Sequence, residues 1–232
     1  MPRKVIHSNG IAEDALVICR EKLQHAVGAR GRASLVLSGG STPLGLYALL
    51  AGSSLPWENI SVFWGDERFV PHDHGDSNCG AARMVLLAPA GVPEQNVHPW
   101  PILETPGQSA AAYEEVIRRE LGDEPVFDLT LLGLGADGHT ASLFPGSAAL
   151  GAAGLTASDL TSAADHPRLT LTASALSSSR TVLFLVSGEN KRTALNQLLA
   201  PEGEAVTAAQ APGRAIGARD EVIVLTDLNT GS

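Results

Sequence analysis

The sequence has 232 residues, of which 44% are hydrophobic but only 4% aromatic and 18% charged, so Ala, Val and Leu fill most of the core. A formal net charge of −9 at pH 7 argues against nucleic acid or an anionic membrane as the main partner. A chain of this length buries a large core without covalent staples, and one domain over residues 1–232 is the simplest organisation.

Cysteine usage and the lack of long apolar runs indicate a cytoplasmic protein. Cys19 and Cys79 make neither a disulfide framework nor a CxxC motif, which is typical of a reducing compartment. Residues 1–6 lack the apolar region of a signal peptide, and no run approaches the roughly 18 apolar residues of a membrane span. We expect a monomer or a weak homodimer that acts on a small molecule.

Strand and helix patterns alternate in the first half of the chain. Apolar runs predict strands at residues 5–7, 33–37 and 60–64, and Val97–His98 allows a further short strand. Helical spacing and start signals predict helices over residues 11–29, 43–50, 78–87 and 108–121. Ser8–Gly10 offers a cap to the first helix, and Ser41 or Thr42 offers one to the second, whose first turn suits Pro43.

The second half continues this alternation less clearly. A buried strand is predicted over residues 128–132, and residues 148–165, which are small and poorly periodic, predict an irregular surface connection. Further strands are expected at 168–172, 181–186 and 221–226, a helix ending at Leu199, and a frayed tail from Asn229. The alternation favours an α/β fold with a mostly parallel sheet.

The segment Ser38-Gly39-Gly40-Ser41-Thr42-Pro43 joins a predicted strand to a predicted helix. This geometry directs free backbone N–H groups, two hydroxyls and the positive end of the helix toward an anion. The segment lacks the lysine of a nucleotide P-loop, so a sugar phosphate fits better than a nucleotide. An ordinary capped turn is the alternative, and the motif alone does not decide between them.

Asp66-Glu67-Arg68 follows the next predicted strand. Arg68 is suited to hold a phosphate or polarise a carbonyl, and Asp66 or Glu67 is suited to orient it or to bind sugar hydroxyls. A structural ion-pair cluster is the alternative, and it would be preferred if this motif stood alone.

The glycine-rich segment 133–146 brings Asp137, His139, Thr140 and Ser142 to the carboxyl end of a predicted strand, where open parallel sheets bind ligands. Its spacing also matches the dinucleotide fingerprint G-x-G-x-x-G. However, Pro145 leaves little room for the long helix that the fingerprint requires, and Asp159 lies in the irregular segment. We therefore expect an acid/base loop in which His139 performs the chemistry.

Other polar residues carry weaker signals. His72-x-His74 with Asp73 and Asp76 contains metal-ligand types, but a solvated turn is favoured on a loop without a clear fourth ligand, and no metal is expected. Cys79 is more simply a buried small residue than a reactive thiol. No G-x-S-x-G elbow supports a serine hydrolase. Four histidines have no partner in sequence: His7, His25, His98 and His166.

Taken in order, these motifs resemble the 6-phosphogluconolactonase family, within a superfamily shared with glucosamine-6-phosphate deaminase/isomerase. The segments that carry the resemblance are SGGSTP (38–43), DERFVP (66–71), Ser77-Asn78, GLGADGHTASLFPG (133–146), RLTLT (168–172) and Gly188-x-x-Lys191. The resemblance implies a modified Rossmann-like α/β fold, with helices on both faces of the sheet. It also implies hydrolysis of 6-phospho-D-glucono-1,5-lactone to 6-phosphogluconate in the oxidative pentose phosphate pathway, without a metal or organic cofactor.

The residues suit that chemistry. Histidine is the side-chain type that ordinarily titrates near neutral pH, so His139 is suited to take a proton from water and return it to the departing ring oxygen. Asp137 would orient His139, and Arg68 or loop N–H groups would stabilise the oxyanion, with Asp66 beside them. The resemblance assigns the phosphate to a cradle with two added cations, made of Gly39, Gly40, Ser41, Thr42, Arg168 and Lys191.

The sequence departs from the family near its end. Residues 222–229 keep a strand and Asp227 but lack the usual tryptophan and alanines, which puts a C-terminal helix in doubt. Two alternative functions stay open: an aminosugar-phosphate isomerase/deaminase on the same scaffold, and a non-catalytic sugar-phosphate sensor. The first would need extra acid/base carboxylates, and the second would not need a general base.

Overall fold

A six-stranded parallel sheet forms the centre of the computed structural model, which describes residues 3–160, 165–201 and 206–229. Every neighbouring pair of strands in this sheet is parallel. In spatial order the strands are β1 (Arg3–His7), β9 (Glu221–Thr226), β8 (Thr181–Val186), β5 (Leu129–Gly133), β2 (Ala33–Leu37) and β3 (Ile60–Trp64). The predicted α/β class with a mostly parallel sheet is confirmed.

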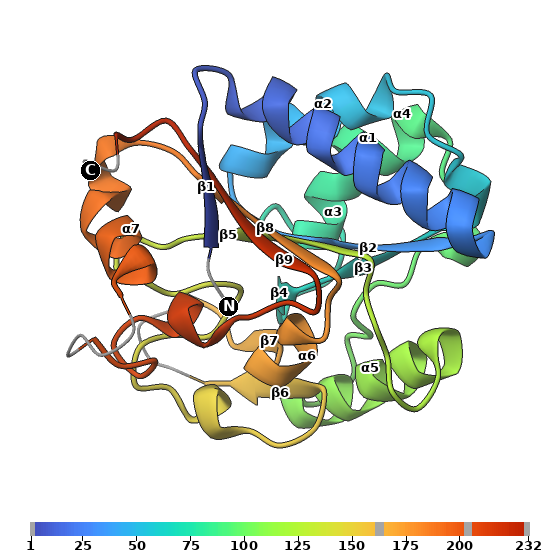
Figure 1. Ribbon diagram of the computed structural model, residues 1–232. Coiled ribbons are helices and arrows are strands. Elements are labelled where there is room, and N and C mark those ends of the chain that lie inside the picture. The colour runs from blue at the N-terminus through green and yellow to red at the C-terminus, as the bar shows by residue number, and fades with distance from the viewer. Residues whose placement is uncertain (1–2, 161–164, 202–205, 230–232) are drawn as a thin grey trace.

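Helices flank this sheet on both sides (Figure 1). On one side lie α1 (Ile11–Arg30), α2 (Thr42–Ala51), α3 (Asn78–Ala82), a π-helical turn (Arg83–Leu87) and α4 (Ala88–Ala90). On the opposite side lie α5 (Pro106–Leu121) and α6 (Ala173–Ser177), and α7 (Arg192–Leu199) follows β8. Among the described residues, no helix has the length and apolar character needed to cross a bilayer.

Both helices begin at residues that the sequence offered as caps, but neither cap makes a side-chain capping hydrogen bond. The N-cap of α1 is Gly10 and makes no side-chain capping bond, because the Ser8 hydroxyl instead accepts the Gly10 N–H at 3.0 Å. The N-cap of α2 is Ser41, and its hydroxyl makes no capping hydrogen bond either. The first turn of α2 therefore keeps N–H groups that no side chain of the cap satisfies.

A second, three-stranded antiparallel sheet was not foreseen. It consists of β4 (Asp66–Arg68), β7 (Arg168–Leu171) and β6 (Thr156–Asp159), with β7 in the middle. The prediction of an irregular connection over residues 148–165 is therefore wrong at β6. Its Ala and Ser have little intrinsic strand preference. The strand is held by β7 and by α5, where the Thr156 hydroxyl donates to the Ala110 carbonyl at 2.7 Å.

Three smaller expectations have different outcomes. Val97 forms only an isolated bridge to Val62, not a strand. No helix follows β9 as far as Asn229, the last described residue, and the rest of the expected frayed tail lies outside the described part of the chain. Residues 161–164 of the expected irregular connection also lie outside it.

Both cysteines are buried, which confirms the structural interpretation of Cys79. Burial raises the pKa of Cys19 to about 12 and that of Cys79 to about 11. Because the thiolate is the reactive form, neither should react with a disulfide reagent such as DTNB at pH 8 in the native protein. Both should react after unfolding in guanidinium, and rapid labelling of a native thiol would contradict this expectation.

Candidate active site

A cleft of about 390 Å³ opens at the carboxyl end of the parallel sheet. From β2 the chain continues to β3 on one side, whereas β5 lies on the other, so the strand order reverses between β2 and β5. Crevices at such reversals are where open α/β sheets bind ligands. The walls come from four places in the chain: residues 38–43; Asp66 and Arg68; residues 133–135 and 139–141; and Leu185, Ser187, Asn190 and Lys191.

His139 and Asp137 form a hydrogen-bonded pair at this cleft. His139 lines the cleft wall, and its Nδ1 lies 2.6 Å from Asp137 Oδ1, which also accepts the His139 backbone N–H at 3.2 Å. Burial acts to raise the pKa of Asp137, but the hydrogen bonds and charge of His139 outweigh it, so the pKa of this carboxyl is lowered. An ionised Asp137 fixes the proton on Nδ1 and leaves Nε2 as the free acceptor.

The glycines of this loop serve the histidine rather than a dinucleotide. A Cβ at Gly135 would lie 2.1 Å from His139 Nδ1, and the Gly135 N–H donates to the His139 carbonyl at 2.7 Å. Gly138 has a φ of +87°, which turns the chain back between them. No long helix follows β5; the next helical element is a 3₁₀ turn at Ala148–Gly151. Close packing on the imidazole therefore explains Gly135 and the left-handed backbone explains Gly138, whereas a Cβ at Gly133 would meet no atom within 4 Å.

The opposite part of the cleft is suited to an anion. Gly39, Gly40, Ser41 and Thr42 line it at the start of α2, together with Lys191. Ser38, where the loop begins, is held in place by Tyr47. The Tyr47 hydroxyl accepts the Ser38 N–H at 2.9 Å and donates to the Ser38 carbonyl at 2.7 Å. Lys191 makes no ion pair with any described residue, so its charge is available to a ligand. A helix N-terminus and an unpaired ammonium group attract a phosphate from two sides.

Asp66 and Glu67 separate into two different roles. Asp66 lines the cleft and accepts a hydrogen bond from the Ser142 hydroxyl at 2.7 Å. Glu67 is fully buried, and its carboxylate accepts the backbone N–H groups of Asn78 and Cys79 at 2.7 and 2.8 Å. Burial raises the pKa of Glu67, with the N–H donors acting in the opposite direction. Glu67 thus anchors the start of α3 and does not face the cleft.

Comparison with known proteins places the chain in a family. The family described as glucosamine-6-phosphate isomerases/6-phosphogluconolactonase matches residues 7–225. A 6-phosphogluconolactonase from Synechocystis is 43% identical, with the alignment covering 98% of this chain and 95% of the relative. The crystal structure of 6-phosphogluconolactonase from Thermotoga maritima superposes with a TM-score of 0.83 at 31% identity and covers 97% of this chain and 99% of that one. A 6-phosphogluconolactonase structure from Shewanella baltica gives a TM-score of 0.84 at 32% identity, with 97% of each chain covered.

The chain belongs to the 6-phosphogluconolactonase family. The resemblance carried by the sequence motifs is confirmed, and so is the prediction that the chain is an enzyme of this class. Its cleft lies where the sequence placed the family motifs SGGSTP, DER and DGHTAS, and it brings eight of the ten predicted site residues onto its walls. These eight are Gly39, Gly40, Ser41, Thr42, Asp66, Arg68, His139 and Lys191.

The two remaining residues of the predicted 6-phosphogluconolactonase site do not line the cleft. Asp137 lies behind His139 and contacts it directly, as described above. Arg168 is paired in register with Arg68 across β4 and β7 and is half-buried. Burial and the charge of Arg68 lower its pKa. Because Arg168 does not line the cleft, its contribution of positive charge to the phosphate cradle stays a prediction.

Several cleft-wall or supporting residues escaped the sequence analysis. Asn78 Nδ2 donates to the Asp66 carbonyl at 3.0 Å, and a Cβ at Gly39 would lie only 2.0 Å from Asn78 Oδ1. Ser187 and Asn190 line the cleft beside Lys191. Two of them carried a signal that could have pointed to them: Asn78, in the family segment Ser77-Asn78, and Asn190, inside the family spacing Gly188-x-x-Lys191.

Proposed function

We propose that this chain hydrolyses 6-phospho-D-glucono-1,5-lactone to 6-phosphogluconate. The observation that carries the proposal is the presence, in one cleft, of a carboxylate-oriented imidazole and an anion cradle with an unpaired lysine. The first group suits a lactone carbonyl, and the second suits a phosphate on the same small molecule. The family relationship supports the same reaction.

A δ-lactone is an activated ester, so a water molecule and a general base suffice without a covalent nucleophile. In the proposed reaction, His139 Nε2 takes a proton from water as the water oxygen attacks C1. Asp137 stabilises the imidazolium that forms. The negative charge that develops on the carbonyl oxygen is stabilised by Arg68 or by N–H groups of the loop. The C1–ring-oxygen bond then breaks, and His139 returns the proton to the ring oxygen.

Replacing Lys191 by alanine should raise KM for the lactone about 10- to 100-fold, because a charge-assisted contact contributes about 1.5–3 kcal/mol. The value of kcat should change much less, since the phosphate lies away from the reacting carbon. The matched control is Lys4→Ala, at an exposed position of β1 outside the cleft. An unchanged KM for Lys191→Ala would remove Lys191 from the phosphate site.

The proposed reaction is tested with freshly generated lactone, coupled to a 6-phosphogluconate dehydrogenase, after subtraction of spontaneous hydrolysis. Lactone consumption above the spontaneous rate supports it. Release of ammonia from glucosamine 6-phosphate with no lactone hydrolysis would favour the isomerase/deaminase alternative. Binding of the product without turnover of the lactone would favour the sensor.

A further inference from the structure

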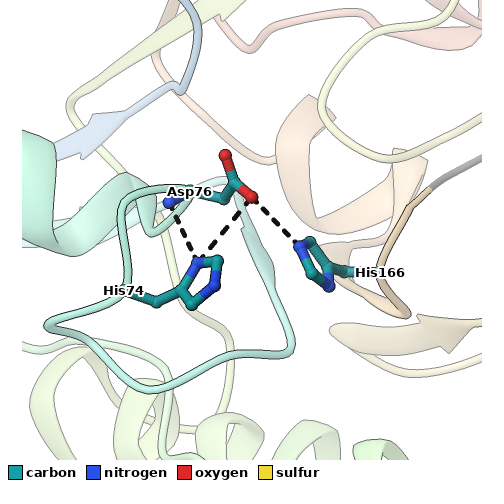
Figure 2. Close-up of side chains that lie close together, drawn as sticks. All are labelled: His74, Asp76 and His166. Atoms are coloured by element: carbon teal, nitrogen blue, oxygen red, sulfur yellow. Dashed lines mark hydrogen bonds and ion pairs between the residues drawn. The ribbon is translucent and has the colours of Figure 1, made fainter.

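A second group of polar side chains lies outside the cleft. His74 and Asp76 belong to the loop after β4, and His166 precedes β7 (Figure 2). We propose that these three side chains bind a divalent transition-metal ion, for which Zn²⁺ is the probe. The site lies outside the cleft, because none of its three residues lines the cleft wall.

The ligand atoms are already close to the spacing that an ion requires. Asp76 Oδ2 lies 3.1 Å from His166 Nε2 and 3.7 Å from His74 Nδ1. All three atoms lie within 4.8 Å of one another. Tetrahedral zinc with bonds of about 2.0–2.2 Å separates its ligand atoms by about 3.4 Å. Small side-chain rotations therefore convert this cluster into three corners of a tetrahedron.

The two rings lie so that each presents one nitrogen to Asp76. The imidazoles meet edge to face, at 82° with centroids 5.4 Å apart, and both direct a nitrogen toward the same Asp76 oxygen (Figure 2). The Asp76 N–H donates to His74 Nδ1 at 3.1 Å, so this nitrogen is unprotonated, and an ion bound to its lone pair would replace this hydrogen bond. His166 Nε2 shares a hydrogen bond with Asp76 Oδ2 at 3.1 Å, and Zn²⁺ would replace the proton in this bond.

The chemistry of the donor set selects the class of ion. Two imidazoles and one carboxylate suit Zn²⁺ and neighbouring transition metals, whereas Mg²⁺ and Ca²⁺ prefer oxygen ligands only. His74 and Asp76 are exposed and His166 is partly exposed, so water can complete the coordination. His72, which the sequence analysis considered together with His74, is not part of the cluster. Its Nε2 lies 3.0 Å from the Trp100 carbonyl oxygen.

An ion here would join the loop after β4 to the segment before β7. Arg68 Nη1 donates to the Asp76 carbonyl at 2.6 Å, and the Phe69 N–H donates to the Pro167 carbonyl at 2.9 Å. The ion would thus link two segments, each of which already accepts one hydrogen bond from the end of β4, at Arg68 or Phe69. Because a ligand that binds only the folded state stabilises it, Zn²⁺ should raise the melting temperature of the protein.

The test is titration of the metal-free full chain with ZnCl₂ by isothermal calorimetry. We expect one site per chain, weakened about 10- to 100-fold or more in His74→Ala, Asp76→Asn and His166→Gln, since loss of even an outer-shell partner costs that much. His166→Gln keeps a hydrogen-bond donor for Asp76 but removes the imidazole. Melting curves without metal establish that each variant is folded, and only wild type and controls should gain stability on adding Zn²⁺.

Two controls make the result specific. His25→Ala removes an exposed histidine of α1, remote in sequence from both loops, and should bind Zn²⁺ like the wild type. His139→Ala removes the cleft imidazole and should also leave binding intact. Equal affinity in wild type and His166→Gln would overturn the proposal, as would absence of binding in the wild type. Binding that is lost only in His139→Ala would place the ion in the cleft and overturn it equally.

Discussion

Replacing His139 by alanine is expected to lower kcat for the lactone by about 10²- to 10⁴-fold, the range that a positioned general base contributes. The Nδ1 of His139 is held by Asp137 at 2.6 Å, so the ring is oriented and its Nε2 remains free for water. No other histidine lines the cleft among the described residues, so none can substitute for it. The KM should change little, because the phosphate cradle lies elsewhere in the cleft.

The measurement compares wild type and His139→Ala in the coupled lactone assay, with the spontaneous rate subtracted at each substrate concentration. His139→Asn serves as a second variant, because it keeps a polar side chain without a basic nitrogen. Circular dichroism melting shows whether either change unfolds the protein. If either variant retained wild-type kcat while folded, His139 would not be the general base.

Gly135→Ala is expected to reduce kcat by about 10²-fold without removing any catalytic group. The new methyl would lie 2.1 Å from His139 Nδ1 and 2.5 Å from Asp137 Oδ1, and contacts this short force both side chains to move. Misplacement of a catalytic group by about 1 Å is sufficient for a loss of this size. The effect should therefore resemble a partial loss of the imidazole.

The matched control is Gly151→Ala, where a Cβ meets no atom within 4 Å and the backbone is not left-handed. It should keep wild-type kcat and KM. The ring signals of His139 in a histidine-resolved NMR spectrum should shift in Gly135→Ala and remain in place in Gly151→Ala. Normal kcat in Gly135→Ala would mean that the loop relaxes without disturbing the His139–Asp137 pair.

The central sheet could be predicted because each of its strands has a recognisable local sequence pattern. Residues 33–37, 129–132, 181–186 and 222–226 are continuous apolar runs bounded by glycine or polar residues, as expected for strands covered on both faces. The small sheet lacks this signal. Its strands β4 and β6 contain charged, alanine and serine residues, and they become strands only because β7 pairs with them.

The candidate site shows the same division. The positions of His139 and of the loop 38–43 at the cleft could be predicted because each lies in one short segment at a strand end. The position of Arg168 opposite Arg68, away from the cleft wall, could not be predicted, because this register depends on the unforeseen sheet. The meeting of Asp76 with His166 likewise depends on two loops far apart in sequence, which no local pattern encodes.

The strand order also has a consequence for how the chain folds during synthesis. In chain order β9 comes after every other described strand, yet it lies inside the sheet, between β8 and β1. Arg3 to His7 of β1 pair only with Val222 to Thr226 of β9, so β1 has no neighbour until those residues leave the ribosome. The nascent chain must therefore carry β1 and one edge of β8 unpaired until β9 has been synthesised, a period in which such edges are exposed to aggregation.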